Sequence, residues 1–303
     1  MAITLKQLRY LVQVAESGSI SLAARQLFIS QPALSAAISQ LEDHFGLALL
    51  IRHHARGISL TPSGAKILAH TRRLLDHADE LDSLGRELGN SVRGEILVGC
   101  FSTLAPFFMP KLLSTVQKSY PELQVQLIEG ALDQVQNALL SGHTELALVY
   151  NIDLDRQLIV EPMTQVQPYV VLPTTHSLAK QPTISLSALE NEPMILLDLP
   201  HSREYFRSLF SDAGLDPTIR HRTQSFELVR GLVGKGHGYS ILNLQPQSSQ
   251  TYDGGRVTYI PIKSSTRSLT IAIARPAGLP VTRRAEVFTD ACRRFFKNLI
   301  GKR

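Results

Sequence analysis

The chain has few cysteines and no long apolar run. Its 303 residues include two cysteines, Cys100 and Cys292, which are too few for a disulfide framework and lack the CxxC spacing of a metal site. No uninterrupted apolar run approaches the roughly 18 residues that a membrane-spanning helix needs. Residues 1–19 lack the apolar core and the small-residue cleavage site of a secretory signal. These absences predict a protein of the reducing cytoplasm, with no membrane partner.

The chain also has little excess charge of either sign. It has 31 lysines and arginines against 26 aspartates and glutamates, and the net charge of +5 is too modest to identify a nucleic-acid binder. Hydrophobic residues make up 44% and charged residues 19%, which is the composition of a globular protein. Because single cores stop growing near ~250 to 300 residues, we expect two domains, or three compact lobes.

The common enzyme motifs are missing as well. Neither a GxSxG elbow nor a GxxxxGKS/T phosphate loop occurs in the sequence. The glycine-rich residues 234–238 connect a predicted helix to a predicted strand, which is the reverse of the order in a dinucleotide-binding fingerprint. They are better interpreted as a helix end and a tight turn. Cys100 could be a nucleophile, but a small apolar strand residue is the simpler interpretation, so we predict that the protein is not an enzyme.

Residues 4–45 have the apolar spacing of three short helices. The first ends near Gly18, the second covers residues 21–27 and the third covers residues 31–43. The short apolar stretches 48–51 and 58–60 then flank a basic turn, which predicts a small β-hairpin.

The second and third helices form the most informative pattern. Ala23 and Ala24 are small enough for two helices to cross closely, and Leu34 closes the core from the other helix. Ser30 is a good N-cap for the third helix, and Pro32 is tolerated in its first turn. The opposite face of the third helix presents short polar side chains at Gln31, Ser35 and Ser39. Such side chains suit base edges and phosphates in a major groove, although an ordinary helical hairpin with a polar outer face is an alternative.

A long helix is predicted over residues 62–89. Its apolar or small positions recur at spacings of 4, 3, 4, 3, 4 and 3, at Ile67, Thr71, Leu74, Ala78, Leu81, Gly85 and Leu88. This is a heptad seam, which predicts pairing with a second copy of the chain. The predicted dimerisation residues are Ile67, Leu74, Ala78, Leu81 and Leu88. The alternative is an amphipathic helix that packs on its own core.

From Gly94 onward, predicted strands and helices alternate, which favours an α/β fold with a largely parallel sheet. The predicted strands are 95–100, 123–128, 145–150, 168–172, 194–197, 218–223, 238–242, 257–260 and 269–274. The predicted helices are 104–119, 132–141, 203–212, 226–235 and 282–298.

Residues 5–64 resemble the winged helix-turn-helix of LysR-type transcriptional regulators. The matching segments are LRY at 8–10, VAESGS at 14–19, Ala23-Ala24, Leu27, SQPALS at 30–35, Ile38, Leu41-Glu42, Gly46, Leu49, Arg52, Leu60-Thr61 and Gly64. The resemblance continues weakly through residues 94–99, 129–130, 145–147 and 231–238. Leu50 replaces a usual Phe and Ile20-Ser21 replaces a common Phe-Thr, changes that affect packing more than base contact.

The resemblance implies a fold that is α/β overall and has three parts. Residues 1–61 would form the winged helix-turn-helix DNA-binding domain, and residues 62–93 the linker and dimerisation helix. Residues 94–303 would form an effector-binding regulatory domain with the two lobes of a periplasmic binding protein. Lobe 1 would contain about 94–161 and 269–300, and lobe 2 about 162–268, with crossovers near 161–163 and 263–265.

The same resemblance assigns DNA contacts residue by residue. Gln31 would pair with a base edge, and the Pro32 ring would pack on a thymine methyl group. Arg52 and Arg56 would follow the wing near phosphates or a minor groove, unless Arg52 instead forms a salt bridge with Glu42 or Asp43. The predicted DNA-binding residues are Ser30, Gln31, Pro32, Ser35, Ser39, Arg52 and Arg56.

An effector would lie between the lobes, at the carboxyl ends of the strands. The predicted contacts are Cys100, Ser102, Thr103, Ala131, Tyr150, Pro200, His201, Ser202 and Gln224. Hydroxyls and free backbone N–H groups at helix starts suit an anionic or polar effector. The alternatives are that Ser102 and Thr103 merely cap a helix and that His201 lies at a solvated helix start.

The expected partners are double-stranded promoter DNA, a small-molecule effector and further copies of the chain in a dimer or tetramer. RNA polymerase is a further candidate partner, and no cofactor is expected. Two other functions are alternatives to this one. A solute-binding protein would need export and would leave residues 1–90 unexplained. An architectural DNA binder without a ligand would show no shift in thermal stability when a metabolite is added.

Overall fold

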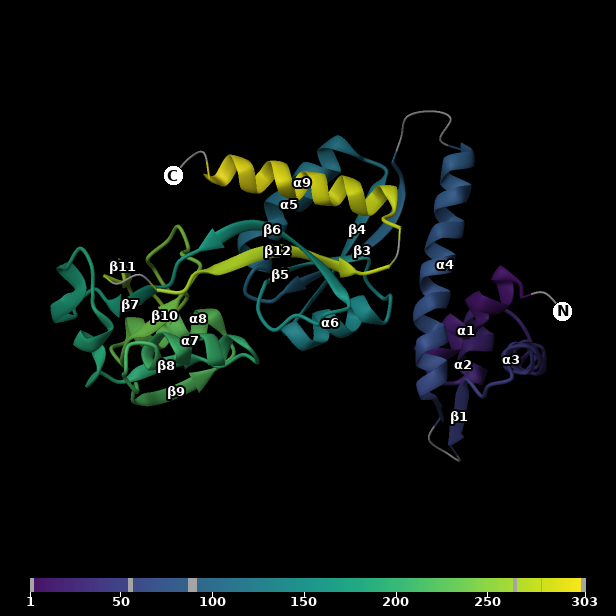
Figure 1. Cartoon of the computed structure of the whole chain (residues 1–303), viewed down its shortest axis with the longest axis horizontal. Helices are drawn as coiled ribbons and strands as arrows, with labels where there is room; N and C mark the ends of the chain where they lie inside the picture. Colours follow the sequence, from purple (N-terminus) through teal and green to yellow (C-terminus); the bar gives the residue numbers. More distant parts are fainter. Residues whose placement is uncertain (1–2, 54–56, 87–91, 264–265, 279, 301–303) are drawn as a thin grey trace.

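The computed structural model describes residues 3–53, 57–86, 92–263, 266–278 and 280–300, with the backbone alone at 82–86 and 300. The chain forms a helical N-terminal domain, one long helix and a two-lobed α/β region (Figure 1). The long helix, α4 (Pro62–Arg86), stands between the N-terminal domain and the lobes. Within the described ranges, no helix is both long and apolar enough to cross a membrane.

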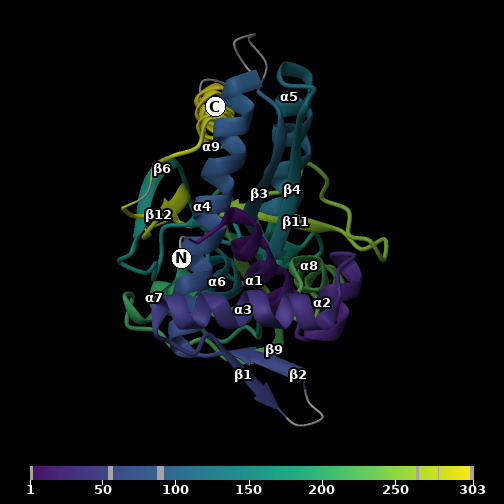
Figure 2. The same ribbon diagram turned by 90° about the vertical axis from the view of Figure 1, so that its right-hand side faces the viewer.

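The N-terminal domain contains three helices and a hairpin, as the sequence predicts. The elements are α1 (Leu5–Ser17), α2 (Ile20–Gln26), α3 (Gln31–Phe45), β1 (Leu50–His53) and β2 (Gly57–Leu60), and the two strands are antiparallel. Thr4 caps α1 by accepting the backbone N–H of Gln7, and Ser30 caps α3 by accepting that of Ala33. Figure 2 shows the hairpin extending beyond α3.

Helix α4 begins directly against the hairpin. A Cβ atom added at Gly64 would lie 2.0 Å from the carbonyl oxygen of Leu49, so only glycine permits this approach. Further along, α4 packs against α1, where Leu68 and Leu75 join the core of the N-terminal domain. The first half of α4 therefore belongs structurally to the N-terminal domain.

Lobe 1 contains a five-stranded sheet with strand order β4-β3-β5-β12-β6. Its strands are β3 (Gly94–Phe101), β4 (Leu123–Gly130), β5 (Leu146–Tyr150), β6 (Leu158–Val166) and β12 (Leu269–Pro276). Helices α5 (Ala105–Ser119) and α9 (Arg283–Ile300) pack together on one face, and α6 (Leu132–Leu140) covers the other (Figure 1).

Strand β6 is absent from the sequence prediction. It contains Pro162, which has no N–H group and argues against a central strand, but β6 is the edge strand of the sheet, where proline is tolerated. Its pairing with β12 extends to Val166, with a register shift beside Ile271. Residues 162–166 thus lie in the sheet of lobe 1, whereas the sequence analysis ended that lobe near residue 161.

Lobe 2 contains a three-stranded antiparallel sheet and a two-stranded parallel one. Its strands are β7 (Tyr169–Pro173), β8 (Met194–Leu197), β9 (Ile219–Thr223), β10 (Ser240–Leu242) and β11 (Val257–Pro261). Its helices are η1 (Ser177–Lys180), η2 (Leu186–Leu189), α7 (Ser202–Ser211) and α8 (Phe226–Gly234).

The expectation of a largely parallel sheet is wrong for much of the α/β region. Strand β3 runs parallel to β4 and β5, but β12 runs antiparallel to both of its neighbours, because the chain returns from lobe 2 in the opposite direction. One continuous apolar cluster extends from lobe 1 into lobe 2, so the two lobes are in close contact.

Candidate DNA-binding face and effector cavity

The start of α3 presents the predicted recognition face. Leu34, Ile38 and Leu41 of α3 are buried against the domain core, whereas Gln31 and Pro32 in its first turn are exposed. The side-chain oxygen of Gln31 accepts a hydrogen bond from the hydroxyl of Ser21 at 3.0 Å. This contact links the starts of the two crossing helices and orients the Gln31 amide. Ser39 is half-buried, two turns further along α3.

Arg52 at the base of the wing reaches back to the recognition helix. Its guanidinium donates to the hydroxyl of Ser35 over 3.2 Å. The alternative salt bridge with Glu42 is not formed, because the Glu42 carboxylate accepts the backbone N–H groups of Leu49 and Leu50. Arg52 is exposed beside the first turns of α3, where a phosphate contact is geometrically available. Arg56 lies outside the described residues.

The predicted seam on α4 is only partly covered within one chain. Leu74 is 51% exposed and Leu81 is 71% exposed, whereas Ile67 and Ala78 are half-buried. Large apolar side chains this exposed, at heptad spacing on one helix, leave a stripe free for a second helix. Leu88 lies outside the described residues.

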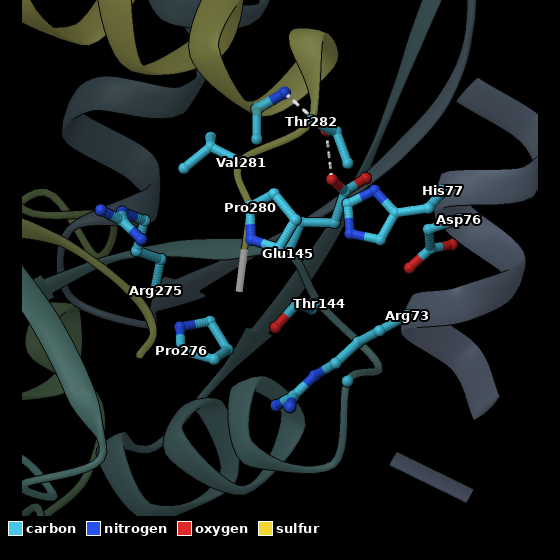
Figure 3. Close-up of a pocket in the computed structure, with 12 residues that line it drawn as sticks. Arg73, Asp76, His77, Thr144, Glu145, Arg275, Pro276, Pro280, Val281 and Thr282 are labelled. Atoms are coloured by element: carbon cyan, nitrogen blue, oxygen red, sulfur yellow. Dashed lines mark hydrogen bonds between the residues drawn. The ribbon is translucent and has the colours of Figure 1, made fainter. Parts of the chain in front are cut away.

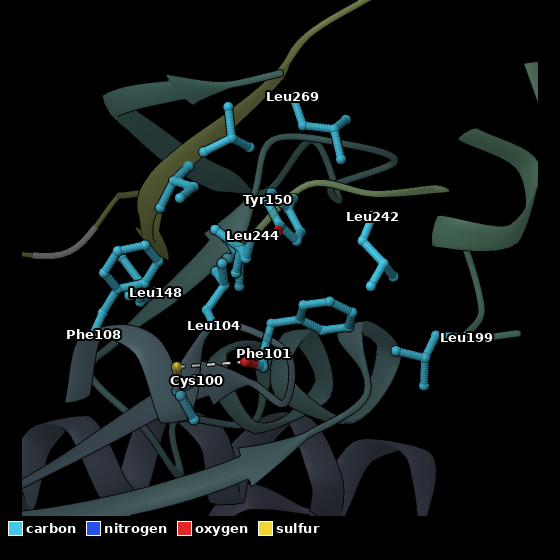
Figure 4. Packing of buried hydrophobic residues seen from close by; sticks show 14 of the residues in the cluster. Cys100, Phe101, Leu104, Phe108, Leu148, Tyr150, Leu199, Leu242, Leu244 and Leu269 are labelled. Atoms are coloured by element: carbon cyan, nitrogen blue, oxygen red, sulfur yellow. Dashed lines mark hydrogen bonds between the residues drawn. The ribbon is translucent and has the colours of Figure 1, made fainter. Parts of the chain in front are cut away.

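A cavity of about 20 Å³ lies between the two lobes, beside the apolar cluster drawn in Figure 4. It is lined by Thr103, Tyr150, Leu197, Ser202, Phe206, Phe226, Leu242, Asn243, Leu244 and Leu269. Three of these, Thr103, Tyr150 and Ser202, are predicted effector contacts, and all three are buried. Burial raises the pKa of Tyr150, and a side-chain hydrogen bond with Thr103 opposes that rise.

Thr103 does not cap a helix. Helix α5 has Leu104 at its N-cap position, without a side-chain cap. The capping alternative is therefore not what the structure shows for Thr103, which lines the cavity wall together with Tyr150.

Asn243 is the main residue of the cavity that the sequence analysis missed. It is 8% exposed, and its Nδ2 donates to the hydroxyl of Tyr205 at 3.3 Å. That hydroxyl in turn donates to the backbone oxygen of Arg267 at 2.7 Å. The side-chain oxygen of Asn243 is buried and has no partner among the described residues. A lone asparagine between Leu242 and Leu244, directly after a predicted strand, was the available sequence signal.

The comparisons with known proteins agree with this two-part architecture. Residues 5–65 match the family described as "Bacterial regulatory helix-turn-helix protein, lysR family", and residues 89–297 match the "LysR substrate binding domain". The chain belongs to the LysR family of transcriptional regulators.

Several relatives resemble this LysR-family regulator over most of its length. The crystal structure of HinK, a LysR family regulator from Pseudomonas aeruginosa, is 37% identical with a TM-score of 0.68, covering 98% of this chain and 100% of that one. The uncharacterized regulator YvbU of Bacillus subtilis is 32% identical and spans 79% of this chain and 81% of its own. A hydrogen peroxide-inducible genes activator of Dickeya chrysanthemi is 27% identical, and the match covers 95% of this chain and 94% of that protein. These matched proteins are named as transcriptional regulators or as a gene activator, and this chain is likewise a transcriptional regulator and not an enzyme.

Six predicted effector contacts of the regulator do not line the cavity, namely Cys100, Ser102, Ala131, Pro200, His201 and Gln224. Cys100 is fully buried in lobe 1, and Gln224 is exposed. His201 instead forms an ion pair with Asp153 across the two lobes at 3.2 Å. Both of these residues have a positive φ, +65° and +46°, so the contact joins two strained backbone positions.

Both cysteines of the regulator are inaccessible. Cys100 and Cys292 have no exposed surface, and burial raises the pKa of each thiol well above its ordinary value. A buried, protonated thiol is a poor nucleophile.

A second cavity, of about 50 Å³, lies where α4 meets lobe 1 (Figure 3). Asp76 on α4 faces Glu145, which precedes β5 and accepts a hydrogen bond from Thr282 at 2.5 Å. Burial raises the pKa of Asp76 to about 7, with the Glu145 charge acting in the same direction and Arg284 opposing it. Burial likewise raises the pKa of Glu145.

Arg73 of α4 donates to the backbone oxygen of Leu140. Polar contacts and a carboxyl pair therefore join the long helix to the regulatory domain.

Proposed function

We propose that the regulator places the first turn of α3 in the major groove of promoter DNA. The proposed contacts are Ser30, Gln31, Pro32, Ser35, Ser39, Arg52 and Arg56, the last on the sequence pattern alone. The observation that carries this assignment is that Gln31 and Pro32 are exposed while the same helix buries Leu34 and Ile38. Direct readout by a glutamine amide would then give specificity, and wing arginines would add affinity through phosphates.

The regulator would act as a homodimer joined along α4. The exposed Leu74 and Leu81 support this pairing, with Ile67, Ala78 and Leu88 completing the seam. Association of two dimers into a tetramer and contact with RNA polymerase, both from the family resemblance, complete the proposal. A location in the cytoplasm is proposed from the low cysteine content of the sequence.

The effector would bind in the cavity between the lobes, where Thr103, Tyr150, Ser202 and Asn243 meet. A ligand changes a two-state protein only through its different affinity for the two states. Because the cavity walls come from both lobes, a bound effector would change how the lobes pack, and α4 would pass that change to the DNA-binding domain through its contacts with lobe 1.

The peroxide response named for the Dickeya relative does not extend to this chain. A thiol-based sensor needs an accessible thiolate, and both cysteines here are buried and held in the thiol form. We therefore favour a reversibly bound small molecule.

The test is a binding titration on an operator selected from random duplexes and on a scrambled copy, at two salt concentrations. Gln31→Ala should lose about 1 to 3 kcal/mol on the operator and relax the preference at one base pair. Arg52→Ala should weaken binding to both duplexes alike and lower the salt slope by about one.

Gln40→Ala is the matched control. Gln40 lies nine positions along α3 from Gln31, which is about half a turn away around the helix, and it bonds Gln7 within the domain. Operator binding that is unchanged in Gln31→Ala, or equally weakened in Gln40→Ala, would refute the recognition assignment.

A further inference from the structure

The cavity between the lobes is walled mainly by apolar side chains. Phe206 and Phe226 from lobe 2 and Leu269 from the returning strand contribute most of the apolar wall, together with the leucines before and after Asn243. Figure 4 shows Tyr150, Leu242 and Leu269 converging on this region. Among the described residues that line it, none carries a formal charge. Burying an ionised ligand group there would have no opposite charge to compensate its desolvation.

The backbone donors near the cavity are largely used by the chain itself. Ser102 and Leu104 donate to the backbone oxygens of Gly130 and Phe101. At the start of α7, Ser202 and Arg203 donate in the same way within their own turn. The backbone N–H of Ala131 donates to the side chain of Gln134. Several of the N–H groups that were expected to hold an anion, at Ser102, Ala131 and Ser202, are therefore occupied.

Asn243 provides a free acceptor whose orientation is fixed by its neighbours. The Tyr205 hydroxyl has one proton, which it donates to the backbone oxygen of Arg267. Its oxygen can then only accept from Asn243, so the amide nitrogen must face Tyr205 and the amide oxygen must be the atom without a partner. Rotating the amide by half a turn would place two acceptors together.

We infer that the effector is an uncharged, largely apolar compound that carries an N–H or O–H donor for the side-chain oxygen of Asn243. This inference rests on the proposed function, because it specifies the ligand of that same cavity. Tyr205 is a positioning residue that holds the acceptor, and the aromatic and aliphatic walls bind the rest of the ligand. A buried acceptor that gains a donor avoids the desolvation cost of remaining unpaired, which gives the ligand its specificity.

Binding also requires the lobes to separate. About 20 Å³ has room for roughly one water molecule, which is less than any organic effector needs. Contacts between the lobes near the cavity include the His201–Asp153 pair and the edge-to-face contact of Phe107 with Phe226, whose ring centres are 5.4 Å apart. The polar pair is accessible to solvent and costs little to break, so the main cost of opening is the apolar packing that joins the lobes, and contacts with the ligand must offset it.

The experiment uses three probes of nearly identical shape: benzamide, acetophenone and benzoate. At the same position of one ring, benzamide presents an N–H donor, acetophenone a methyl group and benzoate a negative charge. Titration calorimetry on the full chain should show benzamide binding at least about tenfold more tightly than either of the others. Tightest binding by benzoate, or no binding of any probe at millimolar concentration, would overturn the inference.

Two variants test the acceptor itself. Asn243→Leu should abolish the preference for benzamide over acetophenone. Tyr205→Phe should reduce it to about threefold or less, because the freed amide can turn either its oxygen or its nitrogen to the ligand. Tyr252→Phe makes the same change at an exposed position and should keep the wild-type ranking. A full benzamide preference retained in Tyr205→Phe would contradict the positioning role.

Operator binding, measured on the same preparations, distinguishes a failure of the ligand inference from a failure of the proposed function. A chain that binds its operator selectively but prefers benzoate has the proposed function and a different ligand class. A chain that ranks the probes as expected but shows no sequence preference on DNA has the inferred ligand chemistry without the proposed function.

Discussion

The carboxyl group of Asp76 should make the junction between α4 and lobe 1 depend on pH. Its pKa is raised from an ordinary 3.8 to about 7 by burial and then by the charge of Glu145. Since the folded-state pKa lies above the unfolded one, the stabilising contribution is fully present below pH ~4 and is lost as the pH rises through about 7. A pKa shift of this size corresponds to a change of about 4 kcal/mol in the free energy of unfolding.

Asp76→Asn keeps the shape of the protonated acid and cannot ionise. It should leave stability nearly unchanged at pH 4 and raise it by a few kcal/mol at pH 8, flattening the profile between these values. The other charged groups that act on Asp76 are Arg73, His77 and Asp79 on α4 and Arg284 on α9, and the variant leaves them in place.

The measurement is thermal melting of the full chain from pH 4 to 8, together with hydrogen exchange of the α4 amides. Asp79→Asn is the control, since Asp79 lies one turn along the same helix and is exposed in an ion pair with Arg9, and its charge raises the pKa of Asp76 less than burial and Glu145 do. The control should alter stability by less than about 1 kcal/mol at any pH. If Asp76→Asn retains the wild-type pH profile, or loses stability at pH 8, then Asp76 is not the buried acid described above.

Three further changes test other parts of the molecule. Leu74→Lys combined with Leu81→Lys should place charge in the α4 seam and weaken dimerisation, and an unchanged sedimentation profile would remove that seam from the interface. Thr103→Val keeps the side-chain shape but loses a hydroxyl, so the effector concentration for half response should rise by about two- to tenfold while operator affinity without ligand stays constant. Gly64→Ala would place a methyl group 2.0 Å from the Leu49 carbonyl oxygen, and should destabilise the DNA-binding domain by about 1 to 3 kcal/mol or more, with effector binding retained. Normal operator binding and an unchanged melting curve in Gly64→Ala would contradict that close contact.

The N-terminal domain could be predicted from sequence because its signals are local. Ser30 as an N-cap, Ala23 at a helix crossing and a 3–4 apolar spacing each act within a few residues, and the observed helices follow them closely. Strand β6 could not be found in the same way. Pro162 is incompatible with a central strand, and only the finished sheet shows that β6 lies at its edge.

Three residues of the cavity between the lobes could be found from the sequence for the same reason. Thr103 follows strand β3, Tyr150 ends β5 and Ser202 begins α7. In an α/β fold, residues at strand ends and helix starts lie where ligands bind, so the sequence indicates their position. The role of Asn243 depends instead on Tyr205, 38 residues away, and on the backbone of Arg267. Hydrogen bonds between such distant segments leave no periodic trace in the sequence. His201 does not line the cavity, because its side chain contacts Asp153 instead.

The position of β12 has a consequence for biosynthesis. This strand lies between β5 and β6, yet lobe 2 is translated before it. While β12 is still in the ribosome, β5 exposes an unpaired edge, β6 has no partner strand in the sheet, and α5 lacks the α9 surface against which it packs. The DNA-binding domain and lobe 2 can mature during translation, but lobe 1 must wait for the last segment. A ribosome that stalls before residue 269 would therefore release a chain able to fold its DNA-binding domain but carrying an incomplete, aggregation-prone sheet.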